Sequence, residues 1–113
     1  MMIGLFMENS RYMRLLVFFD LPVLTSKQKK AYRRFHHFLE EDGYVMLQES
    51  VYSRLVMNYG ASELAVTRLR LNRPPEGTVE CLIVTEKQFA SIEFITGVSN
   101  HNRIDSTERV III

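Results

Sequence analysis

Asp20 is the acidic residue whose place in the sequence could support chemistry. It ends the stretch LLVFFD at residues 15–20, in which five apolar residues lead directly into a carboxylate, and Pro22 follows two positions later. An aspartate at the exit of a buried strand is commonly a turn residue. A single carboxylate is a poor Mg²⁺ site, because catalytic Mg²⁺ bridges protein carboxylates and substrate phosphate. Asp20 is therefore either a turn residue or one half of a metal site that two copies of the chain share.

Basic side chains form the second candidate site. Five of them fall within eight residues: Lys27, Lys29, Lys30, Arg33 and Arg34. In a helix this order opposes the macrodipole, which favours acidic residues at the start. Lys27, Lys30 and Arg34 follow the spacing i, i+3, i+7 and lie near one another, beside helix amides that suit phosphate. The pattern is typical either of a solvated basic face or of a surface that binds a nucleic-acid backbone.

A second basic cluster, Arg68, Arg70 and Arg73, falls at the end of another predicted helix. Bases at a helix C-terminus suit the dipole, so a purely structural role explains this cluster more easily. The two clusters would form one backbone-binding surface if both helices cover the same face of a sheet. The glycine- and aromatic-rich pattern of RNA-recognition strands does not occur in the sequence, so we expect contacts with phosphates and not with bases.

The other reactive residue types form no recognisable site. His36 and His37 would point about 100° apart on a helix, which argues against joint metal binding, and His101 lies in a polar segment. Cys81 is the single cysteine, so the chain forms no internal disulfide, and its apolar neighbours predict that it is buried and inert. The sequence contains no phosphate-binding glycine loop, nucleophile elbow or HExxH motif.

Composition and length indicate one ordinary globular domain. The 113 residues carry 14 basic and 13 acidic side chains, which gives a net charge of +1, so the overall charge does not itself indicate a nucleic-acid partner. No apolar segment approaches the roughly 20 residues that a membrane span requires. The start of the chain lacks the basic leader and cleavage site of a signal peptide, and we expect a cytoplasmic protein with no membrane partner.

The predicted elements alternate between strands and helices. We expect strands at residues 13–20 and 78–86, two strands within 44–57 with a break at 48–50, helices at 26–42 and 61–71, a turn at 87–89, and further strands at 90–96 and 109–113. Thr25 and Gln28 fit a capping box at the start of the first helix, and Gly43 suits its end. The LLVFF stretch of the first strand, residues 15–19, is apolar throughout, which favours a central place in the sheet.

The order β-α-β-β-α-β predicts an α+β fold of the ferredoxin-like type, an antiparallel sheet with two helices on one face, here with extra C-terminal strands. We expect residues 1–12 to be a flexible N-terminal extension, 13–97 the ferredoxin-like domain, and 98–113 a loop and a final strand. The apolar end VIII within residues 110–113 is an aggregation hazard unless it is paired. We expect it to add to a sheet edge in its own chain, a second copy or a partner.

Three motifs in order resemble the Cas-two family of CRISPR-associated proteins. They are MRLLVFFDLP at residues 13–22, QESVYSR at 48–54 and VTEKQF at 84–89, and the basic helix accompanies them. The last motif is similar to the branch of the family found with Cas-nine effectors. The resemblance covers about residues 12–113, and it departs from many members at Phe19, where they carry a tyrosine.

The resemblance implies a ferredoxin-like homodimer whose C-terminal strands pack across the protomers. It also implies a role in spacer acquisition for antiviral defence, in which the dimer bridges two dimers of the Cas-one integrase and holds a short DNA duplex. Some members are described as Mg²⁺-dependent endonucleases on RNA or DNA, and Asp20 would then be the metal ligand. A ligand-sensing ferredoxin-like module is a third hypothesis, which no pocket motif supports.

The residues themselves favour the DNA-bridging role over the nuclease. The chain offers one candidate carboxylate and no evident general base, whereas the basic helix gives a reason to hold a duplex by its backbone. We therefore predict that nuclease activity is secondary or vestigial. The predicted DNA-binding residues are Lys27, Lys30, Arg33, Arg34, Arg68, Arg70 and Arg73.

Overall fold

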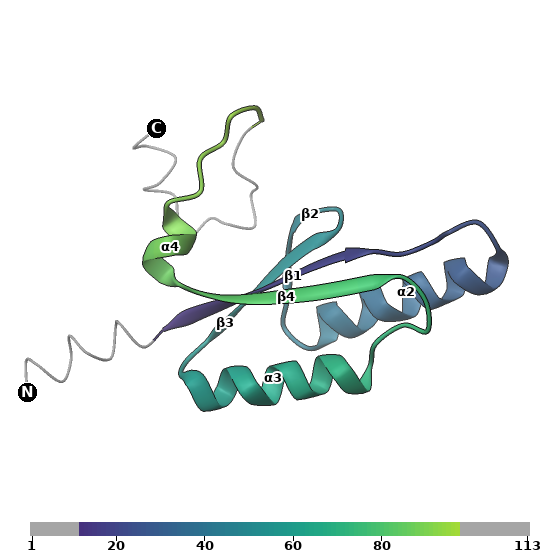
Figure 1. Cartoon of the computed structure of the whole chain (residues 1–113), viewed down its shortest axis with the longest axis horizontal. Helices are drawn as coiled ribbons and strands as arrows, with labels where there is room; N and C mark the ends of the chain where they lie inside the picture. Colours follow the sequence, from purple (N-terminus) through teal and green to yellow (C-terminus); the bar gives the residue numbers. More distant parts are fainter. Residues whose placement is uncertain (1–11, 98–113) are drawn as a thin grey trace, which may run out of the picture.

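One antiparallel sheet forms the centre of the molecule. The computed structural model describes residues 12–97. Its strands are β1 (Met13–Asp20), β2 (Val45–Gln48), β3 (Val51–Val56) and β4 (Thr78–Thr85), and its helices are α2 (Ser26–Glu41), α3 (Tyr59–Leu71) and α4 (Glu86–Ala90). The strand order is β2-β3-β1-β4, and Figure 1 shows α2 and α3 running along the sheet. This arrangement confirms the predicted α+β, ferredoxin-like fold, with β1 as an inner strand.

The strand β1 divides its apolar side chains between the two faces of the sheet, because side chains alternate along a strand. Leu15, Val17 and Phe19 belong to the core that the sheet forms with α2 and α3. Leu16 and Phe18 lie on the opposite face, which we call the open face. Its apolar residues are Leu16, Phe18, Leu47, Val51 and Val84, and Phe89 of α4 packs against them. Leu82, directly opposite Leu16 in the sheet, is 54% exposed.

Local sequence signals determine where α2 begins and ends. Thr25 Oγ1 accepts a hydrogen bond from the Gln28 backbone N–H at 3.0 Å, and Gln28 Oε1 accepts one in return from the Thr25 N–H at 3.0 Å. Asp42 is the C-cap, and Gly43 takes a φ of 93°, which glycine adopts without strain. The predicted capping box is confirmed, and the helix ends one residue earlier than predicted. The break predicted at 48–50 is confirmed: β2 ends at Gln48, β3 begins at Val51, and residues 49–50 form the turn between them. The register of the two strands also shifts between Met46 and Gln48.

The segment after β4 differs from the prediction. We expected a turn at 87–89 and a strand at 90–96, but α4 spans Glu86–Ala90 and no strand follows it up to residue 97. Thr85 and Gln88 form a second capping box, the same signal that starts α2, so the chain enters a helix and not a strand. The predicted strand at 109–113 lies outside the described residues, and the proposed domain limits remain predictions.

Cys81 is exposed, so the prediction that it is buried was wrong. It lies on β4, which is an edge strand of the sheet, and it lines a cavity between α3 and β4. The apolar run around Cys81 correctly indicated a strand. Burial, however, depends on what covers each side of that strand, and an edge strand has a neighbour on one side only.

Tyr52 makes the stability of the core depend on pH. Its side chain is 1% exposed, and its hydroxyl has no hydrogen-bond partner within residues 12–97. Burial raises the pKa of Tyr52 from 10.0 to about 12. Because the unfolded tyrosine ionises at the lower pKa, its contribution to stability is complete below pH 10 and is lost as the pH rises toward 12.

We expect Tyr52→Phe to change the free energy of unfolding by less than about 1 kcal/mol at pH 7, because no hydrogen bond is removed. The midpoint of alkaline unfolding, followed by circular dichroism, should move to higher pH. Part of the alkaline loss should persist, since burial also raises the pKa of Tyr44 to about 12. Tyr59→Phe is the control, because Tyr59 is 64% exposed, and equal midpoints for both variants would contradict the assignment to Tyr52.

Candidate nucleic-acid interface

The helix α2 turns its apolar residues inward and its basic residues outward. Phe35 and Leu39 are buried in the core, which sets the rotation of the helix about its axis. No acidic residue lies in its first turn, so the free N–H groups and the side chains there are positive together. The exposed cations, which we call the basic segment, form no ion pair with another described residue; they are Lys27, Lys29, Lys30, Arg33 and Arg34.

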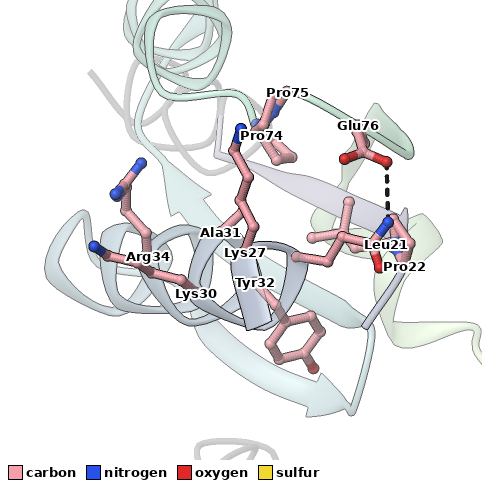
Figure 2. Close-up of a pocket in the computed structure, with 11 residues that line it drawn as sticks. Leu21, Pro22, Lys27, Lys30, Ala31, Tyr32, Arg34, Pro74, Pro75 and Glu76 are labelled. Carbon is pink, nitrogen blue, oxygen red and sulfur yellow. Dashed lines mark hydrogen bonds between the residues drawn. The ribbon is translucent and has the colours of Figure 1, made fainter. Parts of the chain in front are cut away.

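A cavity of about 290 Å³ lies beside the basic segment, between α2 and the loop after α3, and we call it the α2 cavity. Figure 2 shows Lys27 reaching toward Pro74, with Lys30 and Arg34 at one end of the cavity and Glu76 at the other. Gln28 Nε2 donates a hydrogen bond to Glu76 Oε1 at 3.2 Å and so joins the loop to α2. The apolar lining comes from Leu21, Pro22, Ala31, Pro74 and Pro75, and the aromatic side chain of Tyr32 also lines the cavity.

Asp42 holds two arginines from different elements. Arg54 of β3 donates through Nη1 to Asp42 Oδ2 at 3.0 Å and also to the Asp42 backbone carbonyl. Arg68 of α3 donates through Nε to Asp42 Oδ1 at 2.9 Å. The Asp42 side chain is 17% exposed, so this carboxylate is largely shielded from water. Arg68, one of the predicted DNA-binding residues, is therefore already compensated by a carboxylate and attracts phosphate less than a free arginine does.

Arg70 and Arg73 lie on the other side of the loop that borders the α2 cavity. Both line the cavity between α3 and β4, together with Glu80 of the strand. Arg73 Nη1 donates to the carbonyl of Arg70 at 2.7 Å, at the end of α3. Pro74 lines both cavities, so the loop stands between the two basic clusters.

Asp20 is exposed at the end of β1, and the alternation of side chains places it on the open face with Phe18. Gly77 packs tightly against it: a Cβ there would lie 2.7 Å from the Asp20 carbonyl oxygen. Within residues 12–97 no three His, Cys, Asp or Glu side chains gather into a group that could hold a metal. A Mg²⁺ ion at Asp20 would need further oxygen ligands from a second copy of the chain or from a nucleic acid.

The adjacent histidines have different neighbours. The His36 ring stacks on Tyr32 at a centroid distance of 6.4 Å and meets Tyr52 edge-on at 5.6 Å. His37 is exposed, and its Nε2 lies 3.2 Å from a Glu41 carboxylate oxygen. The two rings therefore do not converge on one point. This agrees with the prediction from their helical spacing, which places adjacent side chains about 100° apart. His101 lies outside the described residues.

Two features of this surface were not predicted from the sequence. The α2 cavity combines residues about 50 positions apart, and no local motif marks it. The Asp42 site did leave a signal in the sequence: Arg54 occupies an inward position of β3, between Tyr52 and Val56, where a partly buried cation requires a partner.

A further ion pair joins Arg14 to Glu86 at 2.5 Å. The Arg14 guanidinium also lies 4.6 Å from the Phe89 ring centroid, and both contacts hold α4 against β1.

Known proteins share the sequence that builds this fold. The family model described as CRISPR associated protein Cas2 matches residues 13–92. The chain belongs to the Cas2 family. This confirms the resemblance found in the sequence, and the matched span contains Asp20, the basic segment and both ends of the α2 cavity. Within residues 12–97, no helix has the length and apolar character needed to cross a membrane.

Individual relatives match along most of the Cas2 fold. A protein of Treponema denticola is 44% identical over 101 residues, which cover 89% of this chain and 100% of the relative. One of Streptococcus mutans is 39% identical over 101 residues, covering 89% and 93%. One of Acidovorax ebreus is 49% identical over 85 residues, covering 75% and 83%. All three are named CRISPR-associated endoribonuclease Cas2.

Proposed function

We propose that this Cas2-family chain acts in spacer acquisition, as a homodimer that binds duplex DNA by its backbone and bridges dimers of the Cas-one integrase. The observation that carries the proposal is the basic segment of α2, whose cations are exposed and form no ion pair within residues 12–97. Each Lys or Arg that neutralises a phosphate releases condensed counterions, which is the main source of affinity for a DNA backbone. Such binding needs charge and shape but no catalytic group.

The open face supports the homodimer. It presents the half-buried side chains of Phe18, Val51 and Val84, and Leu82 beside them is 54% exposed. Covering apolar surface contributes roughly 25 cal/mol per Å² removed from water. A second copy on this face would gain that contribution. It would also bring the two basic segments into one assembly, which lengthens the DNA that a dimer can hold.

The relatives are named endoribonucleases, which supports a nuclease as the second candidate function; we propose it in the form of a metal-dependent endonuclease on RNA or DNA. Asp20 would hold Mg²⁺, and two copies of Asp20 across a dimer axis would supply two carboxylates. The ion would stabilise negative charge on the phosphodiester that is cleaved. We rank this function second because, within residues 12–97, no three His, Cys, Asp or Glu side chains gather into a group that could hold a metal; the carboxylate beside Asp20 on the open face is Glu80, diagonally across on β4.

Reconstitution tests the proposed function. The full chain is mixed with the Cas-one integrase of the same CRISPR locus and a short DNA duplex, and the mixture is analysed by size exclusion with light scattering. We expect one complex that contains a dimer of this chain between integrase dimers. Integrase that binds and integrates the duplex equally well without this chain would contradict the proposal.

The variant Asp20→Asn separates the two functions. Because Asp20 is exposed, we expect a change in unfolding free energy within about 0.5 kcal/mol. Since one negative charge is removed from a DNA-binding protein, duplex affinity should stay within about twofold. Integration should be unchanged. If the purified wild-type chain cleaves RNA or DNA, the cleavage should require Mg²⁺. It should be absent in Asp20→Asn.

The matched control is Glu63→Gln, which removes an exposed carboxylate from α3, on the opposite face of the sheet. It should leave both cleavage and integration intact. Loss of integration in a folded, dimeric Asp20→Asn protein, with Glu63→Gln unaffected, would overturn the DNA-bridging assignment and favour the nuclease.

A further inference from the structure

The α2 cavity has an apolar lining that backbone binding does not explain. Phosphates of a duplex contact exposed cations and do not require a recess. Here the cations stand at the rim of a recess lined by Leu21, Pro22, Ala31, Pro74 and Pro75. Its volume of about 290 Å³ is close to the lower end of small-molecule sites, which begin at roughly 300 Å³. The recess therefore suits a small, flat, mainly apolar group that is attached to an anion.

The polar groups of the cavity are arranged with opposite signs at opposite ends. Lys30 and Arg34 lie at one end and Glu76 at the other, with Lys27 between them (Figure 2). Glu76 forms no ion pair with a described residue, and its one hydrogen bond comes from Gln28 Nε2. A carboxylate has about four acceptor positions, so Glu76 keeps acceptors for a ligand.

The amide of Gln28 fixes this end of the cavity. Its Oε1 accepts from the backbone N–H of Leu24 at 2.9 Å and from that of Thr25 at 3.0 Å, while its Nε2 donates to Glu76. All of these contacts hold Gln28 in one orientation. A ligand in the cavity thus meets cations at one end and a positioned hydrogen-bond acceptor at the other.

We propose that the α2 cavity binds an unpaired nucleotide, with its phosphate on Lys30 and Arg34, its base against the prolines, and an exocyclic amino group of the base donating to Glu76. The inference rests on the proposed function, since the same cations serve the duplex. Unpaired bases in protein pockets pack between aromatic or apolar side chains. The Glu76 acceptor adds a preference for guanine, cytosine or adenine, which carry amino groups, over thymine.

The test compares the full-length protein on three labelled duplexes of equal length by fluorescence anisotropy. One is blunt, one carries an unpaired guanine nucleotide at its ends, and one carries an abasic nucleotide there. The abasic duplex keeps the added phosphate and lacks the base. We expect the guanine duplex to bind about tenfold more tightly than the abasic duplex, which is the scale of one stacked base.

Two substitutions assign the effect to the cavity. Ala31→Leu fills the recess without changing charge, and it should abolish the difference between the guanine and abasic duplexes while blunt-duplex affinity stays the same. A fourth duplex with an unpaired thymine nucleotide at its ends measures the preference for guanine over thymine, which Glu76→Ala should remove. Ala61→Leu makes the same chemical change on α3, at a half-buried position outside the cavity, and should have no effect. The comparison of the guanine, abasic and blunt duplexes needs no variant. It therefore tests nucleotide binding even if Ala31→Leu does not fold.

The possible results separate the cavity from the proposed function. Equal affinity for all three duplexes would overturn the cavity proposal and leave backbone binding intact. If no duplex binds, the proposed function fails, and the cavity is then judged on free ligands, dGMP against deoxyribose 5-phosphate. A preference for dGMP that Ala31→Leu abolishes would identify the cavity as a site for free nucleotides, whereas equal binding of the two ligands would overturn it.

Discussion

Replacing Lys27, Lys30, Arg33 and Arg34 together with glutamine is expected to weaken duplex DNA binding about a thousandfold at physiological salt. The slope of log affinity against log salt should become shallower by about 3 to 4 per chain, since each lost phosphate contact removes about 0.9. The expectation follows from the exposure of these four cations and from the lack of any ion pair that would compensate them within residues 12–97. Glutamine is a good helix former, so α2 should persist.

The measurement is a titration of a short labelled duplex at several salt concentrations between about 50 and 200 mM, the range over which phosphate contacts change affinity most visibly. Circular dichroism and thermal unfolding establish that the variant is folded. An unchanged slope with a folded variant would place the DNA elsewhere on the molecule.

Two single substitutions serve as controls for the four-fold change. Lys87→Gln removes a cation from α4, outside the basic segment, and should leave affinity nearly unchanged. Arg68→Gln should likewise have a smaller effect on the salt slope than Arg33→Gln, because Arg68 is already compensated by Asp42 at 2.9 Å. A large loss of affinity from Arg68→Gln alone, in a stable protein, would show that the Asp42 contact opens when DNA binds.

Replacing Asp42 with alanine is expected to lower the free energy of unfolding by about 2–3 kcal/mol, because it leaves two partly buried arginines without their carboxylate. A fully buried pair would lose more, but the Arg68 side chain is 38% exposed, so water screens part of the effect. The contacts that disappear join the end of α2 to β3 and α3, so α2 should also become less firmly positioned.

Urea unfolding of the wild-type and variant proteins measures this loss as a lower midpoint at an unchanged slope. Glu41→Ala is the matched control, because Glu41 directly precedes Asp42 in the chain. Its ion pair with His37 is exposed, and such pairs contribute about 0–1 kcal/mol. Combining Asp42→Ala with Arg54→Met should cost less than the sum of the single changes, since the two residues interact directly. Equal midpoints for Asp42→Ala and Glu41→Ala would contradict a structural role for Asp42.

The local elements of this fold could be predicted because their signals lie within a few residues. The capping box of Thr25 and Gln28, the glycine after Asp42 and the apolar run of β1 each act over one turn or one strand. The helix α4 was equally readable from Thr85 and Gln88, and the error there came from giving an apolar stretch more weight than a cap.

The sequence by itself determined the order of strands and helices from β1 to β4, the family and the exposed basic segment, because periodicity, caps and charge are local properties. Only the tertiary structure decided which of the predicted residues are free to bind. It pairs Arg68 with Asp42 across 26 positions, leaves Cys81 at an uncovered edge, and brings Pro74 and Pro75 against α2 to form the α2 cavity. These outcomes depend on how distant elements pack, which no pattern along the chain records.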